Sequence, residues 1–360
     1  MRYAGTFVIL LVVACILTGG CTKDSTPEKN IPSATGNFGT VTSPAISPTP
    51  VTQAAAVATA GTSQAVPVFN GRYIDVHGHI RPGGMAYSDL LSAMNREGID
   101  TQVIMEPPGA VWIGKVSPTE YGIPGAAIQY PSRFVVLYSG DAGVMLYNAA
   151  KTGSYSKEEQ TRFTTLIEDA VRSGTYEGFG EIGLRHFPPK GMPAIYDITV
   201  PGDHPWMFVM SDVAAKYGVP IDVHMEATDE TVVGLERLLA HNRNTTIIWD
   251  HAGWGNTGTA TPDLMRKLLS ENQNLCTSIK FRKDMAGSGF LNSDGTISQA
   301  WLSVVKEYPD RFMMGSDIKP GIWDNEFRQV KDHVSILSQL PPDISGKVAR
   351  DNAVRIFRIQ

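Results

Sequence analysis

Two histidines lie one residue apart in the run YIDVHGHI, at residues 73–80. Because side chains alternate between the two faces of a strand, Asp75, His77 and His79 are expected on one face. Ile74 and Val76 are then expected on the opposite, apolar face. Such a strand packs its apolar face against the protein and directs its polar face toward a site. The alternative is a half-exposed strand whose histidines face water, and this run by itself does not decide between them.

Four later runs of apolar and β-branched residues also end in a histidine or a carboxylate. These groups are Glu181, His224, His251 and Asp317. Each has an ordinary explanation, because a histidine can be satisfied in a core and a carboxylate can cap a helix or pair with Arg185. Their recurrence at the ends of separate runs is harder to attribute to chance.

These residues can meet only if the runs that carry them are neighbouring strands. The chain contains eight such runs, at residues 73–79, 101–107, 134–140, 177–183, 220–226, 246–253, 275–281 and 312–317. Helical patterns lie between most of them, for example at 88–98, 158–174, 205–218, 229–242 and 263–272, with Gly98, Gly174, Gly218 and Asn242 placed to end helices. Eight alternating units predict an α/β fold, a (β/α)8 TIM barrel over residues 69–360. The C-terminal ends of its strands would meet at one mouth, where active sites form.

A doubly wound open sheet is the structural alternative. That fold favours a glycine-rich phosphate loop directly after the first strand, and HGHIRPGG at residues 77–84 is not such a loop.

Histidine and carboxylate ligands together suit a divalent ion of borderline softness. We expect Zn²⁺, with Mn²⁺ and Fe²⁺ as alternatives, and the sequence leaves open whether one ion or two are bound. No cysteine is among the candidate ligands, which argues against a closed structural zinc site.

The motifs DVHGH, VHME, DHAG and GSD, which follow one another from residue 75 to residue 317, resemble those of the amidohydrolase superfamily. DNAVRIF at 351–357 resembles the final helix of its amidohydrolase-related branch, which includes metal-dependent hydrolases and decarboxylases. The resemblance implies that His77, His79, His224 and Asp317 bind the metal. It also implies that His251 polarises the substrate or binds a second ion.

The fourth run refines the comparison. Binuclear members of the superfamily often bridge their two ions with a carbamylated lysine on this strand, and EGFGEIGL at 177–184 contains no lysine. Glu181, in GEIGL, instead resembles the metal-binding glutamate of TatD-like deoxyribonucleases. We therefore include Glu181 among the predicted ligands.

The implied activity is hydrolysis of a C–N or C–O bond, in an amide, lactone or ester of a small molecule, by a metal-activated water. Asp317 would accept the proton of that water and deliver it to the leaving group, and His251 would stabilise the oxyanion. Lys280 and Arg185 are the candidates for holding an anionic group of the substrate, and His186 and Arg282 are further ones. For each of them an ordinary surface charge is the alternative.

Three other functions stay open. A TatD-like phosphodiesterase would use Glu181 between two ions, but a phosphate substrate would require a more basic rim. A metal-dependent decarboxylase would use the same ligands. A non-catalytic, surface-tethered metal-binding module would not require both His251 and Asp317.

The N-terminus carries an export signal in our interpretation. The apolar run FVILLVVACIL at 7–17 is too short to span a bilayer and suits a signal peptide over residues 1–21. Gly19 and Gly20 before Cys21 resemble a lipoprotein cleavage site, although Thr18 stands where an aliphatic residue is usual. We expect an exported domain anchored to the membrane through lipid on Cys21, with an uncleaved signal anchor as the alternative.

Residues 22–68 are rich in Ser, Thr, Pro and Ala and have no periodic apolar face, so we expect a disordered linker. Of the three cysteines only Cys276 falls in the predicted barrel, so the barrel cannot contain an internal disulfide. A hydrophobic content of 42% suits a well-formed core, and the net charge of −5 without a basic run argues against nucleic acid as the main partner. The sequence does not predict the oligomeric state.

Overall fold

The computed structural model describes residues 69–80, 84–108, 123–188, 196–251, 260–280, 289–320, 327 and 330–360. The predicted signal peptide at 1–21, the predicted linker at 22–68 and Arg282 lie outside these residues. None of the described helices has both the length and the apolar character required to cross a bilayer.

The protein has an α/β fold built on a mostly parallel sheet, as predicted. All eight predicted strands are present: β1 (Tyr73–Gly78), β2 (Ile99–Ile104), β3 (Phe134–Val136), β4 (Phe179–His186), β6 (Ile221–Met225), β7 (Ile247–Trp249), β8 (Leu275–Ile279) and β9 (Phe312–Met314). The short strand β5 (Ile198–Thr199) was not predicted and pairs antiparallel to β4. The strand order is β3-β2-β1-β9-β8-β7-β6-β4-β5, and every other neighbouring pair is parallel.

Backbone hydrogen bonds also connect β3 with β4, the two ends of the parallel series. Tyr138 donates its N–H to the carbonyl of Gly178 at 2.9 Å, and its own carbonyl accepts from Gly180 N–H at 3.1 Å. A parallel bridge pairs Tyr138 with Phe179. An open doubly wound sheet would leave these strands unconnected, so the arrangement is consistent with the predicted (β/α)8 barrel.

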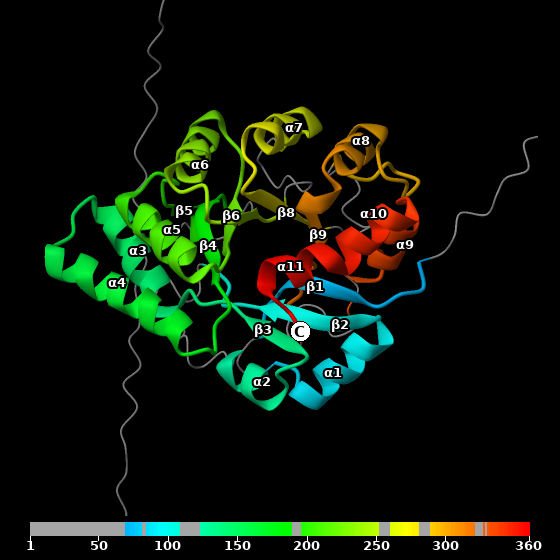
Figure 1. Cartoon of the computed structure of the whole chain (residues 1–360), viewed down its shortest axis with the longest axis horizontal. Helices are drawn as coiled ribbons and strands as arrows, with labels where there is room; N and C mark the ends of the chain where they lie inside the picture. Colours follow the sequence, from blue (N-terminus) through cyan, green and yellow to red (C-terminus); the bar gives the residue numbers. More distant parts are fainter. Residues whose placement is uncertain are drawn as a thin grey trace, which may run out of the picture. The chain divides into compact units, whose positions relative to one another are not determined.

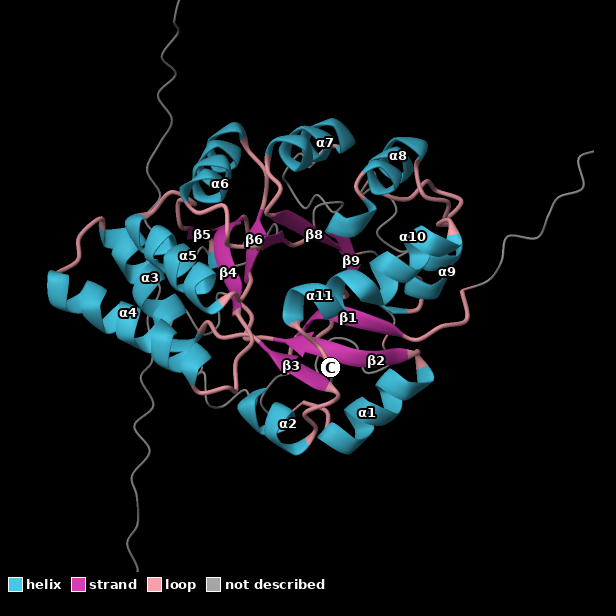
Figure 2. Ribbon diagram, in the orientation of Figure 1, coloured by secondary structure: helices cyan, strands magenta, loops and turns pink. Residues whose placement is uncertain are grey.

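Helices surround the strands, and the last of them, α11, lies across the middle of the view (Figure 1, Figure 2). They are α1 (Tyr87–Arg96), α2 (Ile123–Gln129), α3 (Gly140–Thr152), α4 (Lys157–Arg172), α5 (Pro205–Tyr217), α6 (Asp229–His241), α7 (Pro262–Glu271), α8 (Gln299–Glu307), α9 (His333–Ser338), α10 (Pro342–Gly346) and α11 (Asn352–Phe357). A 3₁₀ turn at 309–311 and a π-helical segment at 347–351 complete the set. The five helices predicted as examples all form, each within two residues of the predicted bounds.

The capping residues at several helix ends explain where those helices begin or end. Gly218 ends α5 in the left-handed conformation, with φ of 64°, as predicted for a C-terminal glycine. Asn242 ends α6 in an extended conformation instead. At the start of α4, Ser156 and Glu159 form a reciprocal capping box, in which each side chain accepts from the other's backbone N–H.

One apolar cluster fills the space enclosed by the strands. It joins side chains of β1, β2, β3, β7, β8 and β9 with α11: Ile74, Val76, Val103, Val135, Ile248, Cys276, Met313, Ile356 and Phe357. On β1, β7 and β9 these residues precede His77, His251 and Asp317, so the cluster supports the site from beneath. A second, larger cluster packs the outward side chains of the strands against the helices.

Strand β1 departs from the strict alternation that we predicted. Its register against β2 shifts between Asp75 and Gly78. Ile74 and Val76 point into the enclosed cluster, and His77 reaches Asp250 on the same inner side. Asp75 does not share that site, because its carboxylate accepts from the side chains of Gln102 and Ser316 at 2.8 and 2.6 Å. A bulge of this kind places two successive side chains on one face.

His333 in α9 is a buried histidine that the sequence analysis did not single out. It is fully buried against the ring of Tyr73, with ring centroids 5.5 Å apart, and neither ring nitrogen has a hydrogen-bond partner among the described residues. Burial lowers the pKa of His333 from 6.5 to about 3.

We expect His333→Leu to reduce the acid sensitivity of the fold. Below pH 6.5 the unfolded chain protonates this histidine and the folded chain does not, so stability falls as the pH drops toward about 3. The maximal slope is about 1.4 kcal/mol per pH unit. Urea unfolding at pH 7 and pH 5 should show a stability loss about 2 kcal/mol smaller in His333→Leu than in the wild type. The exposed His241→Leu is the control and should lose as much stability as the wild type. An equal loss of stability in His333→Leu and the wild type would show that His333 does not change protonation on unfolding.

Candidate metal centre

Four acceptor atoms converge where β1 and β9 end, beside Glu181, the third residue of β4. His77 Nε2 and His79 Nε2 lie 3.2 Å apart, and Glu181 Oε2 lies 3.4 Å from each of them. Asp317 Oδ1 lies 2.9 Å from His79 Nε2 and 3.8 Å from His77 Nε2. All four side chains are buried or nearly so, the most exposed being Asp317 at 14%. We refer to His77, His79, Glu181 and Asp317 as the ligand set.

Backbone pairing between β1 and the segment after β9 fixes three members of the ligand set relative to one another. Asp317 donates its N–H to the carbonyl of His77 at 2.8 Å, and His79 donates its N–H to the carbonyl of Ile318 at 2.9 Å. The ladder between these strands therefore continues through the residues that carry the predicted ligands.

The tautomers of the two histidines follow from their other partners. His79 Nδ1 lies 2.9 Å from the carbonyl oxygen of Met105, which can only accept, so Nδ1 carries the proton. His77 Nδ1 lies 2.8 Å from Asp250 Oδ2, a carboxylate oxygen that also accepts. When both rings are neutral, as they are on binding a metal, each Nε2 presents a lone pair beside the two carboxylates.

A cation satisfies this arrangement, and the residues fit a divalent metal. Two nitrogens bound about 2.0–2.1 Å from one tetrahedral ion lie about 3.3 Å apart, close to the separation of the two Nε2 atoms. Although burial alone would lower the pKa of His77, the charges of Asp250 and Glu181 raise it well above its usual value, so the site attracts positive charge. Burial and the charge of Lys319 lower the pKa of His79 to about 4, which keeps that ring neutral.

Two further aspartates support His77 from behind. Asp250 accepts from His77 through Oδ2 and from Ser278 Oγ through Oδ1, at 2.8 and 2.6 Å. Burial and the neighbouring charge of Asp250 raise the pKa of Asp222 well above its usual value, so Asp222 is protonated. Burial would also raise the pKa of Asp250, but the charge of His77 and its hydrogen bond lower it to about 2. Asp250 is thus the ionised partner that orients His77.

We expect Asp250→Asn to weaken metal binding without abolishing it. The amide oxygen can still accept from His77 Nδ1, but the loss of negative charge makes the imidazole a poorer ligand. Replacement of such supporting groups typically lowers metal affinity by about 10–100-fold. Competition with a chelating dye measures this affinity. The exposed control Asp212→Asn should keep the wild-type metal affinity. The same unchanged affinity in Asp250→Asn would show that the His77–Asp250 pair does not affect metal binding.

His224 and His251 lie beside the ligand set. His224 Nδ1 is 3.0 Å from Glu181 Oε1, the oxygen that does not face His77 and His79. The His251 ring lies 4.8 Å from that of His77 and 5.4 Å from that of His224, between centroids. Glu181, His224 and His251 can together offer three ligand atoms within 4.8 Å of one another. Burial and the charges of Lys280 and His77 lower the pKa of His251 well below its usual value, so this ring is neutral.

Two lysines contact Asp317. Lys280 donates to Oδ2 and Lys319 donates to Oδ1 of the carboxylate. Burial alone would raise the pKa of Asp317, but these two charges hold it well below its usual value. Lys280 is a candidate predicted from the sequence, but Lys319 is not. The only signal for Lys319 in the sequence is its position two residues after Asp317 in GSDIKP.

His251 and Asp317 share an unusual backbone conformation. Their φ angles are 56° and 52°, in the left-handed region that residues other than glycine rarely adopt. Such a conformation costs about 1–3 kcal/mol at each position and persists only where surrounding structure imposes it. Both residues had been predicted as catalytic from the sequence alone.

Arg185 lies away from the ligand set. It donates to Asp197 and to the carbonyl of Ile198, and it stacks 3.6 Å above the ring of Phe187. It lines a cavity of about 820 Å³ between β4, β5 and the start of α6. Among the described residues this arrangement gives Arg185 a structural role, and its predicted contact with substrate stays a prediction.

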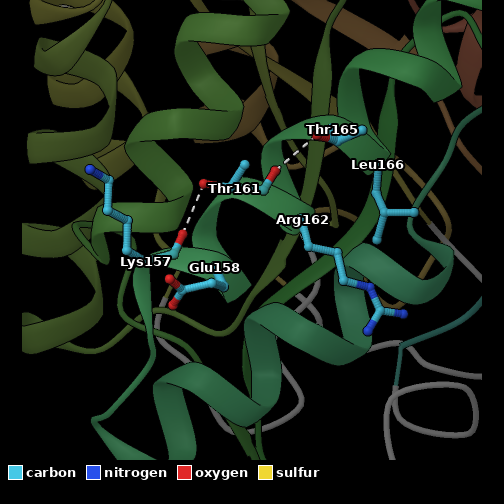
Figure 3. A pocket seen from close by; sticks show the side chains of 6 residues that line it. All are labelled: Lys157, Glu158, Thr161, Arg162, Thr165 and Leu166. Atoms are coloured by element: carbon cyan, nitrogen blue, oxygen red, sulfur yellow. Dashed lines mark hydrogen bonds between the residues drawn. The ribbon is translucent and has the colours of Figure 1, made fainter.

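A second hollow of about 600 Å³ lies on the surface of α4 (Figure 3). Its lining is Lys157, Glu158, Thr161, Arg162, Thr165 and Leu166, all from one helix. Thr161 and Thr165 each donate their hydroxyl to a carbonyl four residues earlier, as the dashed lines in Figure 3 show. Its polar groups belong to the helix surface, and we do not place the chemistry there.

Comparisons with known proteins agree with the resemblance seen in the motifs. Residues 199–359 match the family model described as amidohydrolase. No curated protein matches the chain. The fold is similar to that of 2,6-dihydroxybenzoate decarboxylase complexed with 2,6-dihydroxybenzoate, at 14% identity and a TM-score of 0.52 over 80% of this chain and 99% of the other. It is also similar to 2,6-dihydroxybenzoate decarboxylase from Rhizobium, at 14% identity and a TM-score of 0.51 over the same shares. Identities this low establish the likeness of fold alone.

Proposed function

We propose that the chain, whose residues 199–359 match the amidohydrolase family model, is a metal-dependent hydrolase of this superfamily acting on a C–N or C–O bond of a small molecule. The observation that carries this proposal is the ligand set, in which the Nε2 atoms of His77 and His79 lie 3.2 Å apart and beside carboxylate oxygens of Glu181 and Asp317. The proposal includes a closed (β/α)8 barrel, supported by the strand order and by the bonds of Tyr138.

His77, His79, Glu181 and Asp317 would hold the metal, with His224 and His251 beside them. Zn²⁺ is the ion we propose, with Mn²⁺ and Fe²⁺ as alternatives, because nitrogen and carboxylate oxygen ligands suit each of them. When bound, such an ion supplies Lewis acidity and lowers the pKa of a water to about 7.

Two side chains of the protein would transfer the proton of the attacking water and stabilise the charge that develops on the substrate. Asp317 is placed to accept the proton of the attacking water and to return it to the leaving group. Its carboxylate remains ionised because Lys280 and Lys319 contact it. His251, held neutral beside the ligand set, would donate a hydrogen bond to the oxygen on which charge develops.

We further propose that the substrate carries a carboxylate. Lys280 and Lys319 have side chains only 6% and 13% exposed, and both place an ammonium group against Asp317. Two such groups beside the ligand set would attract an anion into a site of low dielectric constant.

Decarboxylation is the second candidate, because two observations favour it. The lysines suit a substrate carboxylate, and the two similar structures are named as decarboxylases of 2,6-dihydroxybenzoate, an aromatic carboxylate. A decarboxylase would use the same ligand set and release CO₂ instead of consuming water.

The test is a substrate panel assayed with the Zn²⁺- or Mn²⁺-loaded protein. The panel contains lactones, amides and esters with and without a carboxylate, hydroxybenzoates and a phosphodiester. Hydrolysis is read as acid release and decarboxylation as CO₂ release. We expect metal-dependent hydrolysis of a carboxylate-bearing compound. KM for this compound should rise at least about 10-fold in Lys280→Met and in Lys319→Met. KM should be unchanged in the exposed control Lys216→Met. CO₂ release without hydrolysis would replace the proposal with the second candidate, and turnover of the phosphodiester alone would replace it with a phosphodiesterase.

We also propose that the protein works outside the cytoplasm, anchored through Cys21. The support is the sequence pattern at residues 1–21. Fractionation of cells expressing wild type and Cys21→Ser tests it, and an equal membrane share in both would exclude the lipid anchor.

A further inference from the structure

We propose that Arg72, Arg133 and Arg350 form a binding site for a phosphate group, on the face of the fold opposite the ligand set. This proposal does not depend on the reaction proposed above. Arg72 and Arg133 come directly before strands β1 and β3, and Arg350 lies in the π-helical segment before α11. The amino ends of parallel strands meet on one face, just as their carboxyl ends meet on the other. The three guanidinium groups therefore lie on the other face from the candidate metal centre.

Arg72 and Arg133 are held next to each other by two shared acceptors. Nη2 of each arginine donates to the side-chain oxygen of Asn95, at 3.2 and 3.0 Å. The same two atoms donate to the carbonyl of Ile99, at 2.9 and 3.2 Å. Arg133 Nε also donates to the carbonyl of Asp100 at 2.6 Å. These acceptors are uncharged, so they fix two positive groups close together without neutralising either of them.

One carboxylate serves the whole group. Asp100 accepts from Arg72 Nε through Oδ1 at 3.1 Å and from Arg350 Nη1 through Oδ2 at 2.7 Å. In the part of the chain that the structure describes, no other carboxylate forms an ion pair with the three arginines. Three positive charges and one negative charge leave a net charge of +2, whereas the net charge of the whole chain is −5. Burial and the charge of Arg72 lower the pKa of Arg133, as expected where like charges are held together.

The guanidinium groups keep donors for a further acceptor. Among the described residues, Nη1 of Arg72, Nη1 of Arg133 and Nη2 of Arg350 have no hydrogen-bond partner. The side chains of Arg72 and Arg350 are 47% and 41% exposed, so a ligand can reach them from solvent. A phosphate group suits the site better than a carboxylate does, because it offers more acceptor oxygens and as a dianion matches the net charge.

The position of the site favours a phosphate group at a membrane surface. Arg72 lies three residues after Phe69, where the described part of the chain begins. The predicted linker from the lipid anchor proposed at Cys21 therefore enters the fold beside the site. An anionic lipid surface attracts clustered arginines. Four more arginines add positive charge to this face, since they donate to backbone carbonyls at or near the amino ends of other strands: Arg243, Arg311, Arg355 and Arg358.

Two measurements on the full chain test the site and separate a lipid headgroup from a free phosphate ion. Phosphorus NMR follows the titration of the protein with inorganic phosphate. Cosedimentation measures binding to phosphatidylcholine vesicles with and without phosphatidic acid, and the increase due to phosphatidic acid is the readout. Repeating the titration with chelator-stripped protein removes the contribution of phosphate bound at the candidate metal centre.

The variants change the charge of the site in both directions. Arg72→Gln and Arg350→Gln each remove one positive charge at an exposed position, and Asp100→Asn removes the single negative charge. Arg237→Gln is the matched control, because Arg237 is 64% exposed and also pairs with one carboxylate, that of Asp203. Circular dichroism checks that each variant is folded.

We expect Arg72→Gln and Arg350→Gln each to weaken phosphate binding at least about 10-fold, the scale of one hydrogen bond to a charged group. Arg237→Gln should bind phosphate as the wild type does. Asp100→Asn should bind phosphate more tightly than the wild type, because it removes the competing carboxylate, whereas a purely structural role of the arginines predicts no gain. Phosphatidic acid should increase the vesicle-bound share of the wild type, and Arg72→Gln and Arg350→Gln should lose this increase.

Equal binding of both probes by the wild type and by the two arginine variants would overturn the proposal, as would the absence of binding by the wild type. A loss confined to the vesicle assay would support the site and identify a lipid headgroup as its ligand. A loss confined to inorganic phosphate would support the site and identify a free phosphate ion.

Discussion

Replacing His77 and His79 together by asparagine should remove the metal of the ligand set while leaving the fold in place. The two Nε2 lone pairs, 3.2 Å apart, are the only neutral nitrogen donors of that set, and an asparagine amide is a weak ligand. Glu181 and Asp317 would be left as two carboxylates, which cannot hold a transition metal tightly at neutral pH. Elemental analysis should show at least one equivalent fewer in the double variant than in the wild type.

The fold should survive because the packing of β1 depends on other residues. Ile74 and Val76 are fully buried in the enclosed cluster, and the ladders to β2 and β9 use backbone groups. Stability should fall by about 1–3 kcal/mol, because the buried Asp250 carboxylate loses its hydrogen bond with His77. Circular dichroism at 20 °C checks the fold, and His204→Asn/His241→Asn controls for the removal of two histidines. Normal metal content in a folded double variant would end the interpretation of DVHGH as a metal site.

Asp317→Asn is expected to lose at least about 100-fold in turnover, the usual scale for a missing general base. Asparagine keeps the shape of the side chain and adopts positive φ as readily as aspartate, so the backbone at 317 should not change. It can offer a neutral oxygen to the metal, but it cannot accept the proton of the attacking water. It also leaves the ammonium groups of Lys280 and Lys319 without their shared carboxylate.

The measurement is kcat on whichever compound of the substrate panel is turned over, together with metal content. Asp310→Asn, on the exposed 3₁₀ turn before β9, is the matched control. A role as helix cap, for which asparagine serves as well as aspartate, predicts almost no change in rate. Near-wild-type kcat in Asp317→Asn with metal bound would remove Asp317 from the mechanism and favour a binding module.

The sequence was sufficient to predict the eight parallel strands, because each contains a short apolar run and helical patterns lie between most of these runs. It also predicted residues at the strand ends, which is confirmed for His77, His79 and Asp317, whereas Glu181 is the third residue of the eight-residue β4. Parallel strands of one sheet necessarily bring these ends together, so His77, His79, Glu181 and Asp317 could be grouped without coordinates. Their roles as ligands remain predictions.

Only the tertiary structure decided the contacts that depend on register and on side-chain direction. The period-two alternation of a strand predicts that Asp75 and His77 lie on one face. The register shift in β1 directs their side chains to different partners, and His77 contacts Asp250 instead. Lys319 reaches Asp317 through the backbone turn at positive φ, which no spacing rule reveals.

The same limit applies to Arg185 and His224. Both stand at predicted strand ends, yet Arg185 turns to Asp197, whereas His224 contacts Glu181 and the ring of His186. Local sequence sets where a strand ends, since that depends on hydrophobicity and turn chemistry along the chain. Which partner a side chain meets at that end depends on neighbours that are distant in sequence, and these are fixed only when the strands are in register.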